Sequence, residues 1–98
     1  MTVPGIKPDE VEQERLRQVA ELTAEQGKGW EAECRPGSAS CHELLDRTAL
    51  VADLLERYLL AHPACVANAE WYRLAGHAAA ALHDLYQRVG AEHLSADQ

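Results

Sequence analysis

The sequence contains no phenylalanine, a single isoleucine and only two lysines. Aromatic and β-branched residues favour strands, so their scarcity argues against a sheet. Nucleic-acid binding needs a surface of Lys and Arg that neutralises phosphates, whereas this chain has 9 basic against 16 acidic residues and a formal net charge of −7. We therefore expect no direct contact with nucleic acid. An acidic surface suits solubility or a basic partner.

Long apolar runs and a dense set of cysteines are also lacking. No window approaches the ~18 apolar residues of a membrane span, and the N-terminus has no basic region followed by an apolar one. The 3 cysteines are an odd number without the spacing of a disulfide scaffold. These absences predict a cytoplasmic protein that does not insert into a membrane.

The residues that are present favour helices. Hydrophobic residues make up 47% of the chain, most of them Ala and Leu, and Glu, Arg and Gln are abundant among the others. A chain of 98 residues suits one domain with a modest core. We expect an all-α fold in a single domain over residues 1–98, with frayed ends at 1–7 and 95–98.

Capping residues divide the chain into three helices and one long connection. The predicted helices span about 9–26, 41–62 and 69–89, and the predicted loop spans 27–39. Pro8 in a first turn and Gly27 past a last turn bound the first helix. The loop carries Trp30, which we expect to pack on the bundle, with a solvent-facing binding tryptophan as the alternative.

The boundaries of the other two helices depend on five residues. Ser40 and Glu43 fit the S-x-x-E capping box, in which each side chain satisfies a free backbone N–H of the other residue. Pro63 stops the second helix, Asn68 caps the third and Gly90 ends it.

A spacing of 100° per residue predicts which side of each long helix is buried. In the second helix the apolar face contains Leu44, Leu45, Thr48, Val51, Ala52, Leu55, Tyr58 and Leu59. In the third it contains Trp71, Leu74, Ala75, Ala78, Leu82, Leu85, Tyr86 and Val89. The short link between these helices predicts an antiparallel hairpin, with the first helix as a third member or swapped onto a second subunit. Two such hairpins would complete a four-helix bundle as a homodimer.

Four residues are candidates for an interface. Leu50 lies within the polar side of the second helix and Leu54 near its edge, so a partner could cover both. His83 borders a strip of small residues on the third helix, where another helix could approach closely. Trp30 in the loop is the fourth candidate.

One end of the hairpin could bring together Cys41, His42, Glu92 and His93. These residues are the candidates for a metal or redox-thiol site, and ordinary polar helix ends are the favoured alternative. Cys41 near a helix start could have an activated thiol, but its position on the apolar side favours core packing. His42 and Asp46 share a solvent-facing side, where a His–carboxylate pair is common and weak. We expect no cofactor and no catalytic residue.

The sequence therefore predicts a small, non-catalytic helical protein that acts through protein–protein contacts as an adaptor or regulatory module and self-associates. One alternative keeps this fold and makes the chain an acidic inhibitor of a nucleic-acid-binding machine, like phage anti-CRISPR proteins, whose surface fills a basic groove. The other alternative is a metal or thiol protein that uses the Cys41 end of the bundle.

Overall fold

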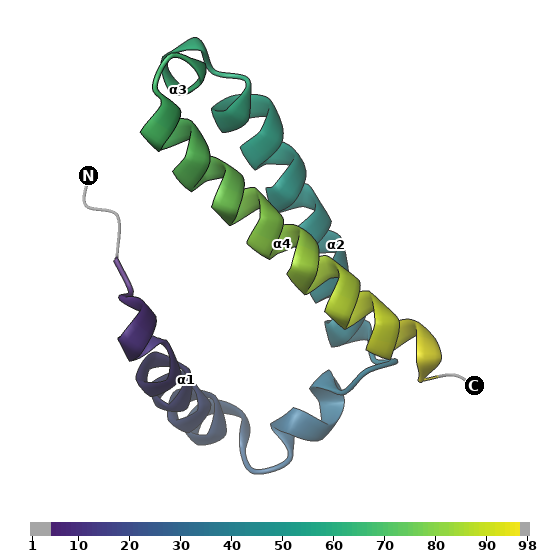
Figure 1. Ribbon diagram of the computed structural model, residues 1–98. Helices are drawn as coiled ribbons and strands as arrows, with labels where there is room; N and C mark the ends of the chain where they lie inside the picture. The colour runs from purple at the N-terminus through teal and green to yellow at the C-terminus, as the bar shows by residue number, and fades with distance from the viewer. Residues whose placement is uncertain (1–4, 97–98) are drawn as a thin grey trace. The chain divides into compact units, whose positions relative to one another are not determined.

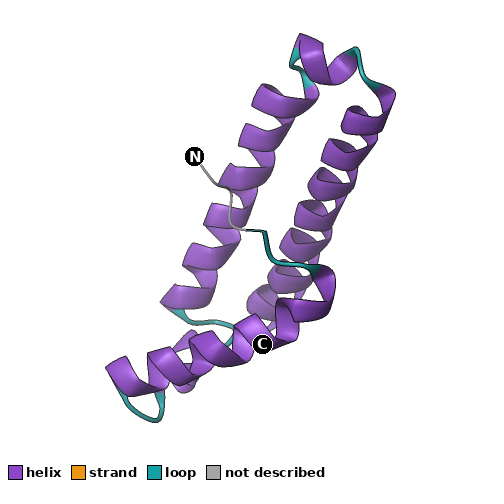
Figure 2. Cartoon of the chain, turned by 90° about the vertical axis from the view of Figure 1, so that its left-hand side faces the viewer, coloured by secondary structure: helices purple, strands orange, loops and turns teal. Residues whose placement is uncertain are grey.

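The computed structural model describes residues 5–96, and every regular element in that range is a helix (Figures 1 and 2). Residues 5–96 contain no strand, which confirms the all-α prediction. The chain forms two compact units, Met1–Glu33 and Cys34–Gln98, which are described separately below. The predicted frayed ends fall partly on residues 1–4 and 97–98, which lie outside the described residues.

The first unit is built on one helix. A short 3₁₀ turn, η1 (Pro8–Glu10), leads into α1 (Val11–Gln26), close to the predicted range. Gly27 ends α1 with φ 85°, and its N–H donates to the carbonyl of Thr23 at 2.9 Å. Glycine suits this position because a side chain is strained in the left-handed region. The predicted loop contains a second 3₁₀ turn, η2 (Trp30–Cys34).

The second unit starts with α2 (Ala39–Leu55), and its cap differs from the predicted one. Ser38 is the N-cap, and its Oγ accepts the backbone N–H of Cys41 at 3.1 Å. The helix therefore begins two residues earlier than predicted, which places Ser40 inside the first turn. There the Ser40 hydroxyl contacts the sulfur of Cys34 at 3.4 Å instead of capping. The predicted Ser40–Glu43 capping box is wrong.

A π-helical turn, η3 (Glu56–Leu60), continues α2 towards Pro63. Each residue in a π turn advances by a smaller angle than in an α-helix, so the alignment of side chains slips by about one residue. Leu60 is accordingly half-buried, whereas Leu59, which we expected on the buried face, is exposed. The sequence carries no proline or glycine in this turn that would mark the change.

The link between the long helices contains the single helical turn α3 (Pro63–Val66), and α4 (Ala69–Ser95) follows it. Asn68 caps α4 as predicted, since its Oδ1 accepts the N–H of Trp71 at 3.1 Å. The predicted stop at Gly90 is wrong, because α4 continues through this residue to Ser95. Gly90 is buried in the helix and faces α2.

The helices α2 and α4 lie side by side and antiparallel, with α3 across their connected end (Figure 1). Their contact contains the buried side chains of the described chain, Cys41, Leu45 and Thr48. Leu45 Cδ1 lies 3.7 Å from the point where a Cβ of Gly90 would stand. The hydroxyl of Thr48 donates to the Leu44 carbonyl at 2.8 Å, so its burial leaves no polar atom unsatisfied. The predicted hairpin is confirmed.

Within residues 5–96, every helix is too short or too polar to span a membrane.

We predict that Ser38→Ala lowers the free energy of unfolding of the hairpin by about 0.5–2 kcal/mol, because the Cys41 N–H loses its cap. The matched control is Ser40→Ala, which removes a hydroxyl two residues away and leaves the cap intact. Urea unfolding followed by Trp71 fluorescence in a Trp30→Phe background measures the hairpin alone. If Ser38→Ala and Ser40→Ala lowered the free energy of unfolding equally, the assignment of Ser38 as the cap would be wrong.

We predict that Gly90→Ala raises the free energy of unfolding by roughly 0.5–1 kcal/mol, because alanine has the better helix propensity. The new methyl would meet Leu45 at ordinary van der Waals distance. Gly76→Ala is the control, since no atom lies within 4 Å of its added Cβ. The same urea titration compares them. If Gly90→Ala lowers the free energy of unfolding while Gly76→Ala raises it, the helices are closer at Leu45 than described.

Candidate interaction surface

The hairpin buries only part of the apolar side of each helix. On α4 the residues nearest α2 are small or central ones: Ala75, Gly76, Ala79, Leu82, Val89, Gly90 and His93 are half-buried or buried. Trp71, Leu74 and Leu85, which we expected on the buried face, are 56%, 57% and 42% exposed. On α2, Leu44 and Val51 of the predicted buried face are likewise about half exposed. The predicted apolar faces are thus wider than the contact between the helices.

Six of the exposed apolar residues of the hairpin lie on one side of it. At 100° per residue, and with the slip of the π turn for Leu59, the exposed residues of each helix are displaced in the same rotational sense from the line that contacts the other helix. Because α2 and α4 are antiparallel, an equal rotational sense places both rows on the same side. We call this surface the apolar face. It consists of Leu44, Val51 and Leu59 from α2 and η3, and Trp71, Leu74 and Leu85 from α4.

Each row of the apolar face has the spacing of a helix–helix contact. Leu44, Val51 and Leu59 are separated by 7 and 8 residues, and Trp71, Leu74 and Leu85 by 3 and 11 residues. Both rows extend along roughly 20 Å of helix at 1.5 Å per residue. Ala78 and Ala81, also exposed, fill the gap between Leu74 and Leu85. The face can therefore accept helices aligned with α2 and α4.

Charged side chains stand at the edge of the apolar face. Glu70 and Arg88 are exposed on α4, on the edge remote from α2 and at opposite ends of the row from Trp71 to Leu85. Neither forms an ion pair within residues 5–96, even though Asp84 lies one turn before Arg88. Along α2 and η3, by contrast, Arg47 pairs with Glu43 at 3.3 Å and Arg57 with Asp53 at 2.9 Å.

Three of the predicted interface residues belong to the hairpin, and they point in different directions. Leu54, 37% exposed, lies at the outer edge of the apolar face, beside Val51. Leu50 is 56% exposed but is turned further from the face, by about 100° from Val51. His83 is exposed on the opposite side of α4 from Leu85. Trp30 belongs to the other unit.

Trp30 packs on the helix that precedes it. Its indole N–H donates to Thr23 Oγ1 at 2.9 Å, and the Thr23 hydroxyl donates in turn to the carbonyl of Val19 at 2.8 Å. The half-buried ring borders an open hollow of about 380 Å³ whose apolar lining also includes Ile6, Val11 and Leu22. The hydrogen bond gives the polar edge of the ring a partner and fixes its orientation on α1.

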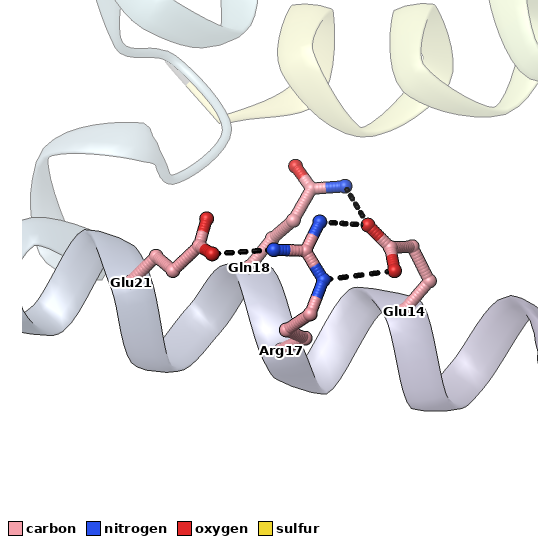
Figure 3. A network of polar contacts seen from close by, with 4 residues as sticks. All are labelled: Glu14, Arg17, Gln18 and Glu21. Atoms are coloured by element: carbon pink, nitrogen blue, oxygen red, sulfur yellow. Dashed lines mark hydrogen bonds and ion pairs between the residues drawn. The ribbon is translucent and has the colours of Figure 1, made fainter. Parts of the chain in front are cut away.

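A network of ion pairs runs along the exposed side of α1 (Figure 3). The Arg17 guanidinium donates to both carboxylate oxygens of Glu14 and to Glu21, and the Arg17 Nε to Glu14 Oε2 distance is 2.9 Å. Gln18 adds a longer contact to Glu14 at 3.5 Å. The hydrogen bonds from Arg17 hold the pKa of Glu14 below its ordinary value, and Glu14 together with Glu21 raises the pKa of Arg17. These contacts support a helix whose apolar side is narrow.

The open end of the hairpin brings together two of the predicted metal candidates. The ring centroids of His42 and His93 are 5.4 Å apart. His93 Nδ1 accepts the N–H of Gly37 at 2.9 Å, which ties the turn before α2 to the end of α4. His42 Nε2 lies 3.5 Å from a carboxylate oxygen of Asp46, the pair that we expected on the solvent side.

The other two candidates at this end lie in different environments. Cys41 is buried, as its position on the apolar side predicted, and Glu92 is exposed. In the described part of the chain, no three His, Cys, Asp or Glu residues are placed to hold a metal ion. The thiols of Cys34, Cys41 and Cys65 are all free. The clearest role at this end is therefore the tie that His93 makes to Gly37.

Sequence reasoning missed the apolar face as one surface, although it named all six of its residues as core. The overlooked signal is the width of the apolar arc on both helices, which exceeds what one neighbouring helix can cover.

No protein-family model matches the chain, and neither the curated proteins nor the solved structures contain a significant match.

We predict that Arg17→Gln raises the pKa of Glu14, because that carboxylate loses its main hydrogen-bond donor. A carboxylate whose pKa is lowered by folding stabilises the helix above its ordinary pKa, and this contribution is lost as the pH falls through the lowered value. In the wild type α1 should therefore lose helix content in acid, whereas Arg17→Gln should have less helix at neutral pH and a smaller further loss in acid. NMR titration of the Glu14 side chain and of the α1 amides measures both effects. Arg15→Gln is the control, because Arg15 pairs with Glu12; an equal shift in that variant would contradict the assignment.

Proposed function

We propose that the protein acts through protein–protein contacts and that the apolar face of the α2–α4 hairpin is its docking surface. The observation that carries the proposal is that six large apolar side chains, 42–57% exposed, lie on one side of two adjacent helices. Single exposed apolar residues are normal on protein surfaces, whereas a contiguous patch along two helices is typical of an interaction site.

The energy available from covering this face is large for a small chain. Complete burial of a side chain such as Leu, Val or Trp contributes about 1.5–3 kcal/mol, so covering the exposed half of six gives roughly 5–9 kcal/mol before the costs of association. The buried side chains of the hairpin itself are three, Cys41, Leu45 and Thr48, among the described residues. A partner on the apolar face would therefore bury large side chains that the hairpin contact leaves about half exposed.

The composition of the apolar face also resembles that of interface centres. Trp71 is the type of residue that most often dominates binding energy, and the charges of Glu70 and Arg88 stand at the edge rather than in the middle. Arg47 on α2 and Glu92 on α4 also stand beside the apolar residues, near the open end of the hairpin. This arrangement favours a module whose partner is held by apolar contact and oriented by charge.

The test is a photo-crosslinking experiment with the full chain in its host cells. A benzophenone amino acid replaces Leu74 on the apolar face or, as the matched control, Leu94, which is 71% exposed and lies on another side of α4. We expect covalent protein adducts from position 74 and none above background from position 94. Adducts from neither position, or equally from both, would contradict the proposed docking surface.

A pair of adjacent substitutions shows whether the adduct depends on the apolar face. Val51 and Leu50 are 48% and 56% exposed, but only Val51 lies on the face. Val51→Glu should reduce the position-74 adduct by about tenfold or more, because it places an unpaired carboxylate in the contact. Leu50→Glu should leave it within about twofold. If Leu50→Glu reduced the adduct and Val51→Glu did not, the docking surface would lie on the outer side of α2.

A further inference from the structure

The apolar face has two parallel rows, so its occupant must present two rows as well. One row follows α2 and the other follows α4, and the helices of the hairpin lie side by side (Figure 1). A single helix would cover the groove between the rows, whereas two helices at the same spacing would cover both. The hairpin of a second copy of this chain has that spacing.

The row on α4 is nearly symmetric about the point between Ala79 and Ala80. Leu74 and Leu85 are equally far from that point, and so are Ala78 and Ala81. If two copies of α4 cross this point in antiparallel order, Leu74 meets Leu85 of the second copy and Ala78 meets Ala81. The alanines at the centre allow a close approach of the helix axes. A two-fold axis generates this arrangement, since each contact then occurs twice.

The same arrangement gives partners to the two unpaired charges at the edge. It places Arg88 at the level of Glu70 and Trp71 of the second copy, on the same outer edge. Glu70 and Arg88 form no ion pair with each other or with any other residue in the described range. In the dimer each Arg88 would face a carboxylate and an indole ring, both of which attract a guanidinium.

In the other two-fold arrangement of the same faces, α2 of the second copy covers α4 of the first. That arrangement places like charges opposite each other. Leu45 lies level with Gly90, and His42 lies level with His93, so Arg47 is level with Arg88 and Glu43 with Glu92. If α2 of the second copy covered α4 at this level, each Arg88 would face Arg47 and each Glu92 would face Glu43. Like charges at an interface edge disfavour association, so the charges select the antiparallel pairing of α4 with α4.

From these observations we infer that the apolar face binds the same face of a second copy of this chain, with the two α4 helices antiparallel and Arg88 of each beside Glu70 of the other. This inference rests on the proposed function, because it names the occupant of the proposed docking surface. The first unit of the same chain and an unrelated protein are the competing occupants, and the experiment below distinguishes them.

The experiment measures the dimer dissociation constant of the full chain by sedimentation at 0.15 M salt for the wild type, Arg88→Glu, Glu70→Arg and the double variant. We expect a wild-type dimer. Each single variant replaces two attractive pairs with two repulsive ones and should weaken it by about tenfold. The double variant should recover most of the wild-type dimer affinity. Circular dichroism checks that helix content is unchanged.

The decisive measurement mixes the two single variants. Arg88→Glu carries two acids at the edge and Glu70→Arg carries two bases, so a mixed dimer has only attractive pairs. We expect the mixture to associate with nearly wild-type affinity although neither variant does so alone. A folding defect cannot produce this result. Tighter association of Arg88→Glu alone would overturn the inference, because it would show Arg88 facing Arg47.

The outcomes separate this inference from the proposed function. A wild-type chain that stays monomeric at 100-fold its concentration in the crosslinked cells overturns the self-association. Adducts of position 74 with other proteins would then still support the docking surface. A second outcome is that Leu74→Glu abolishes the dimer while Arg88→Glu and Glu70→Arg keep the wild-type dissociation constant. That outcome overturns the antiparallel register. An intramolecular adduct from position 74 to residues 5–33 of the same chain would identify the first unit as the occupant and overturn the inference.

Discussion

The contact of Leu45 with Gly90 decides how the hairpin is arranged. Leu45 of α2 lies against α4 at Gly90, and both residues are buried. This point fixes which residues of the two helices stand level. One turn further along, His42 therefore meets His93, and His93 reaches the N–H of Gly37. The contacts of Leu45 with Gly90 and of His42 with His93 agree on one register of the two helices.

A hairpin packed on small residues leaves its large ones outside. The line of α4 that touches α2 contains Gly76, Ala79 and Gly90 beside Leu82 and Val89, and the small residues among them let the helices lie close together. Trp71 and Leu74 stand to one side of that line and remain more than half exposed. The close contact and the exposed apolar face are therefore two results of the same distribution of residue sizes along α4.

Much of this fold could be predicted from local signals, because Gly27 and Asn68 act on their own neighbours in sequence. Ser40 failed as a cap because the helix starts earlier, and two serines separated by one residue are equally good candidates. Gly90 failed as a stop because its neighbour Leu45 is distant in sequence, and glycine is typical both of helix ends and of close packing. The apolar periodicity predicted buried faces that are wider than the buried part, since Leu44, Val51 and Leu74 are about half exposed. It contains no information on which part of an apolar arc the neighbouring helix of the same chain covers.

The charges supply part of that missing information. The arginines of α1 and α2 in ion pairs have acidic partners three or four residues away on their own helix. In α4, Arg88 has Asp84 at that spacing and does not pair with it in the structure. Surface pairs within a helix contribute little, so an arginine at the edge of an apolar face can exchange such a partner for one across an interface at small cost. A near-symmetric row of Leu and Ala between Glu70 and Arg88 is what an antiparallel contact of α4 with itself requires. The selectivity of such a contact would depend on the two edge charges, whereas its strength would depend on Trp71 and the leucines.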